Sequence, residues 1–273
     1  MTAKILDVTP DEYHARPGFS STIAKVLIDQ SPLHAKASAG LPPSKLLDRG
    51  TVIHRLVLGK GKDYAILQFK DWRTDKAKDA RDEARKGGLV PVLEHEFADY
   101  AAAAEHIRVQ LAERGIVLDG ASELAVEWIE QTEHGPVTCR AMFDHLWLVE
   151  GAILDLKITG DAAPASVERT AENLGYAIQA AAYTRALTAL DGDLAGRIKF
   201  LFAFCEPDDP YAINVSQPDG VFRELGERRW LRAVSTWAHC QKTGIYPGYG
   251  TSINYLNPPA WALAREGYTT DER

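Results

Sequence analysis

The segment from Val137 to Thr159 carries the pattern that most restricts how this chain can fold. It holds two runs in which apolar and polar residues alternate, separated by Glu150-Gly151. Alternation over four to eight residues is typical of a β-strand with one buried face, and two such runs around a glycine-containing turn predict a β-hairpin. We therefore expect two antiparallel strands here, joined by Glu150-Gly151 as a two-residue turn.

This pairing predicts which polar side chains meet. With a two-residue turn, Val149 faces Ala152, and counting outward places Asp144 opposite Lys157. Because side chains alternate between faces with a period of two, Asp144, Asp155 and Lys157 would project from the same face. The apolar residues of the second strand would point into a core on the other face: Leu154, Leu156 and Ile158.

Two carboxylates and a lysine on one face can hold a divalent cation and orient the water that attacks a phosphodiester. The pattern therefore favours a nuclease site. It depends on the turn, because a loop one residue longer would move Asp144 to the face opposite Asp155. The alternative is an ordinary half-exposed hairpin with its polar residues outward.

Composition sets the wider limits. The 273 residues are 45% hydrophobic and 25% charged, which is typical of a globular protein with a substantial core. No apolar run approaches the roughly 20 residues that span a membrane, and the N-terminus lacks the pattern of a signal peptide, so we expect a cytoplasmic protein. Three widely spaced cysteines form no CxxC pair and predict structural thiols. A net charge of -7 counts mildly against nucleic-acid binding.

Along the rest of the chain, we expect helices and strands of one α/β domain, with helices flanking a mixed sheet. A serine of Phe19-Ser20-Ser21 would cap a short helix, and Pro42-Pro43 would break the chain. Further helices are predicted over about 44–58, 72–86, 94–114, 166–190 and 222–242. Further strands are predicted over 123–129, 197–205 and 211–215. The tail from Gly244 is expected to pack as irregular structure.

Several other residues are candidates for the same site. Glu123 and Glu127 would share one face of their strand, and either one could reach the aspartates or face solvent. His54, on an otherwise apolar helix, is either an interior hydrogen-bonded residue or a cation ligand. Tyr176, Gln179 and Tyr183 recur at i, i+3 and i+7 and so form one helix stripe, which is either ordinary packing or a phosphate-positioning surface.

In this order, these motifs resemble the PD-(D/E)XK nucleases of the RecB-like branch. The motifs are Gly50-x-x-x-His54, Glu123, Asp144, Asp155-x-Lys157 and Gln179-x-x-x-Tyr183. The resemblance is strongest to the RecE, or exonuclease VIII, type of phage recombination exonuclease, and it extends over most of the chain. It implies a restriction-endonuclease-like core with an N-terminal helical extension, as a single domain. Residues 1–115 would be mainly helical, and residues 116–273 would hold the catalytic sheet.

The resemblance also implies roles for these residues. His54, Asp144, Asp155 and the Leu156 main-chain carbonyl would bind the catalytic Mg²⁺, or Mn²⁺ in its place, and Glu123 would complete the site or hold a second ion. Lys157 would orient the attacking water, and its flanking carboxylates would keep it protonated. Gln179 and Tyr183 would sit at the phosphate next to the ion.

The activity that the resemblance implies is a Mg²⁺-dependent exodeoxyribonuclease. It would degrade one strand of duplex DNA from an end, 5′ to 3′, and leave a 3′ overhang for a single-strand annealing recombinase. A homo-oligomer is expected, and no membrane partner. Two alternatives remain open: a nicking or flap-processing endonuclease of repair or defence, and a catalytically inactive adaptor that binds DNA ends.

Overall fold

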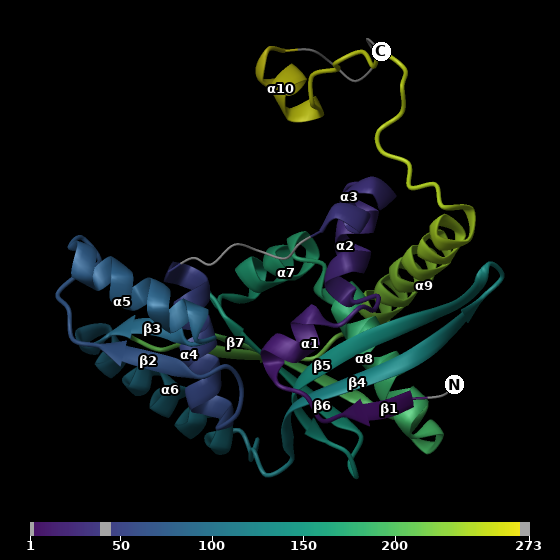
Figure 1. The fold of residues 1–273 in the computed structure, drawn as a ribbon. Helices are drawn as coiled ribbons and strands as arrows, with labels where there is room; N and C mark the ends of the chain where they lie inside the picture. The colour runs from purple at the N-terminus through teal and green to yellow at the C-terminus, as the bar shows by residue number, and fades with distance from the viewer. Residues whose placement is uncertain (1–2, 39–44, 268–273) are drawn as a thin grey trace.

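A computed structural model, which describes residues 3–38 and 45–267, shows a mixed α/β fold built around a six-stranded sheet (Figure 1). The strand order is β1-β4-β5-β6-β7-β8. These strands are β1 (Ala3–Leu6), β4 (Ala121–Thr132), β5 (Gly135–Trp147), β6 (Ala152–Ile158), β7 (Lys199–Cys205) and β8 (Ile213–Ser216). Only β6 and β7 run parallel to each other, so the sheet is mixed, as predicted.

The hairpin of β5 and β6 exists, but its predicted turn is wrong. Its last pair is Trp147 with Ala152, so the loop holds four residues, Leu148 to Gly151, instead of two. The register shifts by two residues as a result. Because side chains alternate with a period of two, an even shift leaves each residue on the face where the shorter turn would have placed it.

The sheet separates two apolar cores. On one face, α2 (Ser21–Asp29), α8 (Tyr176–Leu190) and α9 (Gly220–Thr243) pack over a core that includes Trp128, Phe143 and Trp230. On the other face, α4 (Lys45–Leu58) and α6 (Glu94–Glu113) pack over a second core. Leu154 and Leu156 are buried in this second core with Ile158 against it, which confirms the face predicted for them.

The connection from β6 to β7 differs from the single long helix that the sequence predicted. Two helices fill it, α7 (Pro164–Asn173) and α8, and Gly175 precedes the second one. Gly175 has a φ of 69°, a left-handed conformation that glycine adopts without steric cost. A β-carbon there would also lie 3.0 Å from the Lys25 side chain of α2, but this flexible side chain can move, so the backbone conformation is what favours glycine.

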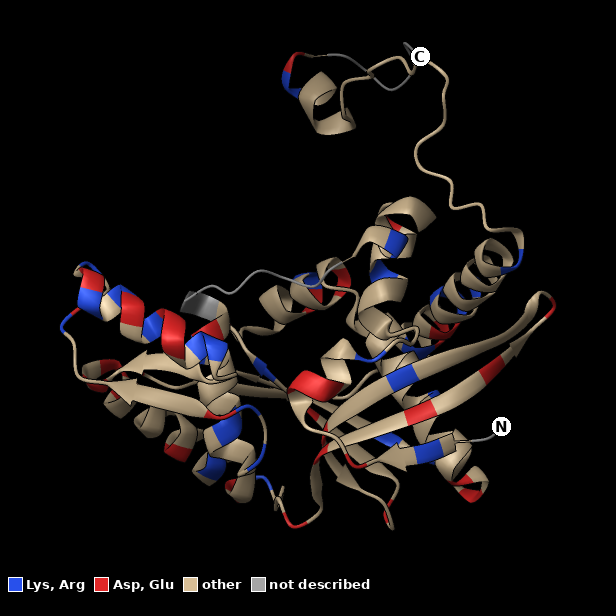
Figure 2. Ribbon diagram, in the orientation of Figure 1, with Lys and Arg blue, Asp and Glu red and all other residues tan. Residues whose placement is uncertain are grey.

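Four predicted helices agree with the structure: α4, α6, α9 and the charged α5 (Asp75–Lys86). Lysine, arginine and acidic residues alternate along α5 (Figure 2), and short ion pairs such as Lys78–Asp75 cover it, as expected for a solvated helix. Ser20 caps α2 by accepting the Ile23 N–H, which also confirms the prediction. The predicted break at Pro42-Pro43, with Ser44, lies outside the described residues.

The first 115 residues contain more strand than predicted. β1 pairs with β4 at the edge of the main sheet, and β2 (Tyr64–Leu67) pairs in parallel with β3 (Val90–Leu93) as a separate sheet. Two short helices, α1 (Pro10–Ala15) and α3 (Pro32–Ala37), complete this part of the chain. Each of these strands has four residues, too few for a period of two to stand out.

The tail packs as irregular structure only over its first residues, where Tyr246 meets Trp237 of α9 edge to face and the Pro247 carbonyl accepts the Leu33 N–H of α3 at 3.2 Å. Farther on, the chain leaves the body of the protein (Figure 1), Ile253 and Leu256 are 94% and 98% exposed, and a short helix, α10 (Ala260–Arg265), follows. The cysteine prediction is confirmed, because Cys139, Cys205 and Cys240 are buried free thiols. Among the described residues, none of the helices combines the length and the apolar character needed to cross a membrane.

Candidate active site

The site begins where β5 and β6 separate. Regular pairing between the two strands ends at His145 and Leu154. Beyond that point the Asp144 carboxylate lies between the strands and accepts the main-chain N–H of Leu156 at 2.7 Å. A side-chain oxygen thus takes the place of a main-chain carbonyl in the ladder, which keeps a buried donor satisfied and anchors the carboxylate.

Glu123, on the neighbouring strand β4, turns toward Asp144 because of an unusual backbone conformation. Its φ is 53°, in the left-handed region that residues other than glycine rarely adopt. Its carboxylate oxygen lies 3.3 Å from His54 Nδ1. Glu127 instead pairs with Lys4 of β1 at 2.8 Å and with Arg16. Of the two glutamates that the sequence left open, the structure therefore brings Glu123 to the site.

His54 connects the two acidic side chains. His54 lies on α4, which covers the sheet face that carries Leu154 and Leu156. The Nε2 atom of His54 lies 2.9 Å from Asp144 Oδ2. Within the described ranges, His54, Glu123 and Asp144 each offer one ligand atom such that these atoms lie within 4.8 Å of one another. Burial disfavours the charged imidazole, but Asp144 and Glu123 outweigh it and raise the pKa of His54 to about 10.

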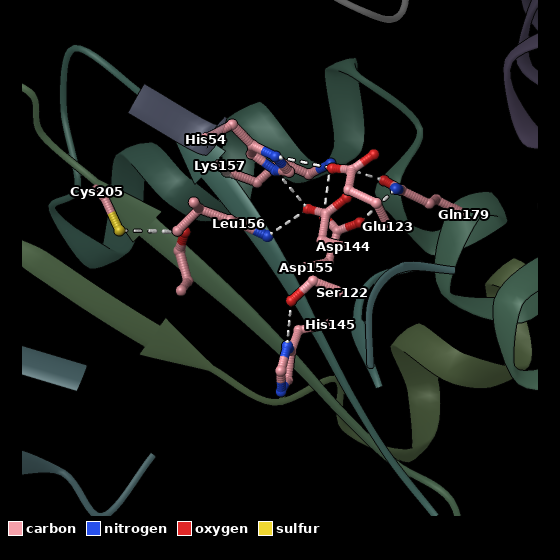
Figure 3. Close-up of polar contacts among 11 residues, drawn as sticks. His54, Ser122, Glu123, Asp144, His145, Asp155, Leu156, Lys157, Gln179 and Cys205 are labelled. Carbon is pink, nitrogen blue, oxygen red and sulfur yellow. Dashed lines mark hydrogen bonds and ion pairs between the residues drawn. The ribbon is translucent and has the colours of Figure 1, made fainter. Parts of the chain in front are cut away.

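Asp155 and Lys157 form the other half of the site (Figure 3). Lys157 Nζ lies 2.6 Å from Oδ2 of the fully buried Asp155, and the two groups form a close ion pair. Gln179 of α8 holds both groups, since it donates to Asp155 Oδ1 at 2.6 Å and accepts from Lys157 Nζ at 3.0 Å. Asp155 lies outside the group of three that share the 4.8 Å distance.

Burial and neighbouring charges set the protonation of this half. Burial raises the pKa of Asp155 to about 7, against the attraction of Lys157. Burial also disfavours the charged form of Lys157, but Asp155 outweighs it and raises the pKa of the amine. The lysine is therefore an ammonium group, as predicted.

The tyrosines of α8 have different surroundings. Lys157 Nζ lies 4.5 Å from the centroid of the Tyr176 ring, a cation–π contact. Tyr183 meets Phe143 edge to face at 5.3 Å, and burial raises its pKa well above the usual value, so its phenol stays neutral. The sequence indicated Tyr176 only through the stripe that it shares with Gln179 and Tyr183, and the roles implied by the resemblance did not include it.

The side chains present fit a divalent cation. Asp144 stays ionised, because burial, which opposes the charge, is outweighed by His54 and Lys157, and its pKa is lowered. An imidazole nitrogen and two carboxylates form a donor set that Mg²⁺ or Mn²⁺ accepts. Asp155 Oδ2 is buried and forms its ion pair with Lys157 Nζ. The Leu156 carbonyl remains a predicted ligand.

The proton on His54 should make the metal-free protein less stable at high pH. The folded pKa, about 10, exceeds the value of about 6.5 for an unfolded histidine, so the stabilisation is complete below the lower value and is lost as pH rises through the upper one. In EDTA, we expect the free energy of unfolding to fall by roughly 1–3 kcal/mol more in the wild type than in His54→Gln between pH 7 and pH 10. Urea melts at both pH values measure this, and parallel curves for the two proteins would contradict it.

Comparison with known proteins gives one family match and two solved structures. A family model described as a PDDEXK-like domain of unknown function (DUF3799) matches residues 42–259. A solved structure from Eubacterium rectale, described as a "Putative exonuclease", is similar with a TM-score of 0.57 and 13% identity over 96% of this chain and 99% of that one. A phage-related exonuclease from Haemophilus somnus 129PT aligns over 84% of this chain and 96% of its own at 11% identity, with a TM-score of 0.35, too low to indicate a shared fold. No curated protein matches the chain significantly.

Proposed function

Because this chain belongs to the PDDEXK-like domain family DUF3799, we propose that it is a divalent-metal-dependent exodeoxyribonuclease acting on the ends of duplex DNA. The family and the fold are those of the PD-(D/E)XK nucleases, with a restriction-endonuclease-like core. Fold alone does not set the reaction, so the proposal depends on the residues of the site.

One observation carries the proposal. Asp144, from the gap between β5 and β6, and Asp155 with Lys157, from β6, lie in one cluster with His54 (Figure 3). Such a convergence of acidic oxygens with an ammonium group suits the hydrolysis of a phosphodiester. An ordinary hairpin with polar residues facing solvent would not bury Asp155 completely.

The chain's own residues supply distinct parts of the reaction. His54, Glu123 and Asp144 would hold the divalent ion, with Asp155 and the Leu156 carbonyl completing the site. When bound, the ion supplies Lewis-acid polarisation of the phosphate and a bound water of lowered pKa. The Lys157 ammonium orients the attacking water and offsets the negative charge that grows on the phosphate oxygens in the transition state.

Gln179 keeps these groups in place. Its amide bridges Asp155 and Lys157, so the ammonium cannot rotate away from the reaction centre without breaking a buried hydrogen bond. Tyr183, also on α8, is held neutral and would contact the phosphate beside Gln179. Gln179 and Tyr183 thus position the scissile phosphate against Lys157.

The direction and partners belong to the same proposal. We expect cleavage from 5′ to 3′, a 3′ overhang that a single-strand annealing recombinase takes up, and a homo-oligomeric enzyme in the cytoplasm. The exonuclease description of the Eubacterium rectale structure supports an end-directed activity, as does the resemblance of the ordered motifs to the RecE type.

Lys157→Ala tests the chemistry. On linear duplex DNA labelled at one 5′ end, with each strand labelled in turn, the wild type should release nucleotides only when Mg²⁺ or Mn²⁺ is present. Lys157→Ala should be slower by about a hundredfold or more, because the ammonium that stabilises the transition state is gone. Lys78→Ala, which removes an exposed lysine on α5, is the matched control and should act like the wild type.

Three outcomes distinguish the alternatives. Equal inertness of the wild type and Lys157→Ala, with DNA ends still bound, would favour the adaptor. Nicking of a closed circular duplex would favour an endonuclease, because an exonuclease requires an end. The labelled products give the direction, because degradation from the 5′ end releases the 5′ label at once as a short product, whereas degradation from the 3′ end leaves progressively shorter labelled strands.

A further inference from the structure

His145 and Ser122 form a buried pair beside the acidic cluster that the proposed chemistry does not use (Figure 3). His145 is fully buried, with Nδ1 2.8 Å from Ser122 Oγ and Nε2 3.1 Å from the main-chain nitrogen of Gly120. A main-chain N–H can only donate, so Nε2 carries no hydrogen and Nδ1–H donates to the serine hydroxyl. The two ring nitrogens therefore hold the start of β4, because Gly120 directly precedes the strand and Ser122 lies within it.

The residue that this pair adjoins is Glu123. In the ladder between β4 and β5, Ser122 pairs with His145 and Leu124 pairs with Phe143, with Glu123 between them at its φ of 53°. A left-handed conformation is unfavourable for a residue with a β-carbon, and it persists only when the surrounding structure imposes it.

On the C-terminal side of Glu123, Leu124 holds the backbone in place. It is paired with β5 and packed against the core shared by α8 and α9. On the N-terminal side of Glu123, side chains of β5 hold the backbone in place. His145 holds Gly120 and Ser122, and Trp147 donates from Nε1 to the Val117 carbonyl at 3.0 Å and to Asp119 at 2.9 Å.

The approach of the two strands is close at this point. A β-carbon on Gly120 would lie 2.3 Å from the Leu146 carbonyl oxygen and 3.0 Å from His145 Nε2. The rings of Trp147 and His145 meet edge to face, with centroids 4.5 Å apart. The backbone before Glu123 is therefore fixed, and its unusual conformation is the one that turns the carboxylate toward His54.

We propose that His145 is a positioning residue, which holds Glu123 in its left-handed conformation and so places the third cation ligand beside His54 and Asp144. This inference deepens the proposed function and rests on it for the identity of the site. Without the imidazole, Glu123 relaxes to an extended conformation and its side chain turns away. Asp144 keeps its bonds to the Leu156 N–H and to His54, so one ligand of the three is lost.

Metal binding, measured without DNA, tests this role. Titration calorimetry with Mn²⁺ should show about 10–100-fold weaker binding to His145→Ala than to the wild type, the usual cost of losing a group that orients a ligand. Ser122→Ala should weaken binding in the same direction but less. His106→Ala, which removes a histidine stacked on Tyr211 away from the site, is the control and should bind like the wild type.

A double variant separates positioning from general damage. Glu123→Gln should weaken Mn²⁺ binding by itself, and adding His145→Ala to it should change the affinity less than about twofold, because the group that His145 positions is already lost. Independent effects that multiply would overturn the inference. So would wild-type affinity in His145→Ala.

The remaining outcomes are also decisive. If His145→Ala fails to fold by circular dichroism, Ser122→Ala alone and with Glu123→Gln gives the same comparison, and additivity there overturns the inference. A wild type that binds Mn²⁺ but leaves linear DNA intact would refute the proposed nuclease. The Mn²⁺ affinities of the variants would then still decide whether His145 positions Glu123. A wild type that binds no Mn²⁺ would refute both.

Discussion

Asp144→Asn should lower the rate of strand degradation by about a hundredfold to a thousandfold and leave the fold intact. The amide oxygen can still accept the Leu156 N–H, so the hydrogen bond that links β5 and β6 survives. The negative charge does not survive, and the cation loses one of its two closest carboxylates. Release of label from linear duplex at saturating Mg²⁺ measures the effect, with circular dichroism and thermal melts to confirm the fold.

Glu127→Gln is the matched control for this prediction. Glu127 lies on β4 only four residues from Glu123, but its carboxylate pairs with Lys4 on the edge strand. Exposed or half-exposed ion pairs of this kind contribute about 1 kcal/mol or less, so the variant should keep wild-type activity. Full activity in Asp144→Asn, or a comparable loss in Glu127→Gln, would contradict the assignment of the site.

Gly226→Ala should destabilise the protein strongly, although it adds only one methyl group. Gly226 lies on α9 where it meets α8, and a β-carbon there would sit 2.1 Å from the Ala177 carbonyl oxygen and 2.7 Å from its carbon. The contact is with backbone, so α9 and α8 must move apart. We expect a loss of about 2–3 kcal/mol in the free energy of unfolding and a fall in Tm of roughly 5–10 °C.

The same movement should reach the active site. Gln179 lies two residues after Ala177 on α8, so a shifted α8 misplaces the amide that holds Asp155 and Lys157. Activity at low temperature, where Gly226→Ala is folded, should therefore fall as well. Gly220→Ala, at the start of α9 with open space around its β-carbon, should match the wild type in both measurements. A Gly226→Ala protein as stable as Gly220→Ala would show that the helices separate at little cost.

The local pattern of the chain was sufficient for most helices and for the existence of the hairpin. The positions of α4, α5, α6 and α9 follow from periodicity and from glycines at or near their ends. The local pattern did not determine the length of the hairpin loop, because Glu150-Gly151 carries no strong preference for a loop of two residues over one of four. The break at Gly175 was missed because a glycine inside a helical pattern does not by itself distinguish a tolerated residue from a boundary.

The residue types of the candidate site could be predicted from the sequence: two aspartates, a lysine, a histidine and a glutamine at spacings that the ordered motifs share. Only the tertiary structure decided that Glu123 and not Glu127 turns toward His54, and that Asp144 enters the gap between two strands. Periodicity specifies the face on which a side chain lies in a regular strand. It cannot report where the strands separate or where a backbone becomes left-handed, because contacts with residues far along the chain, such as those of His145, impose these departures.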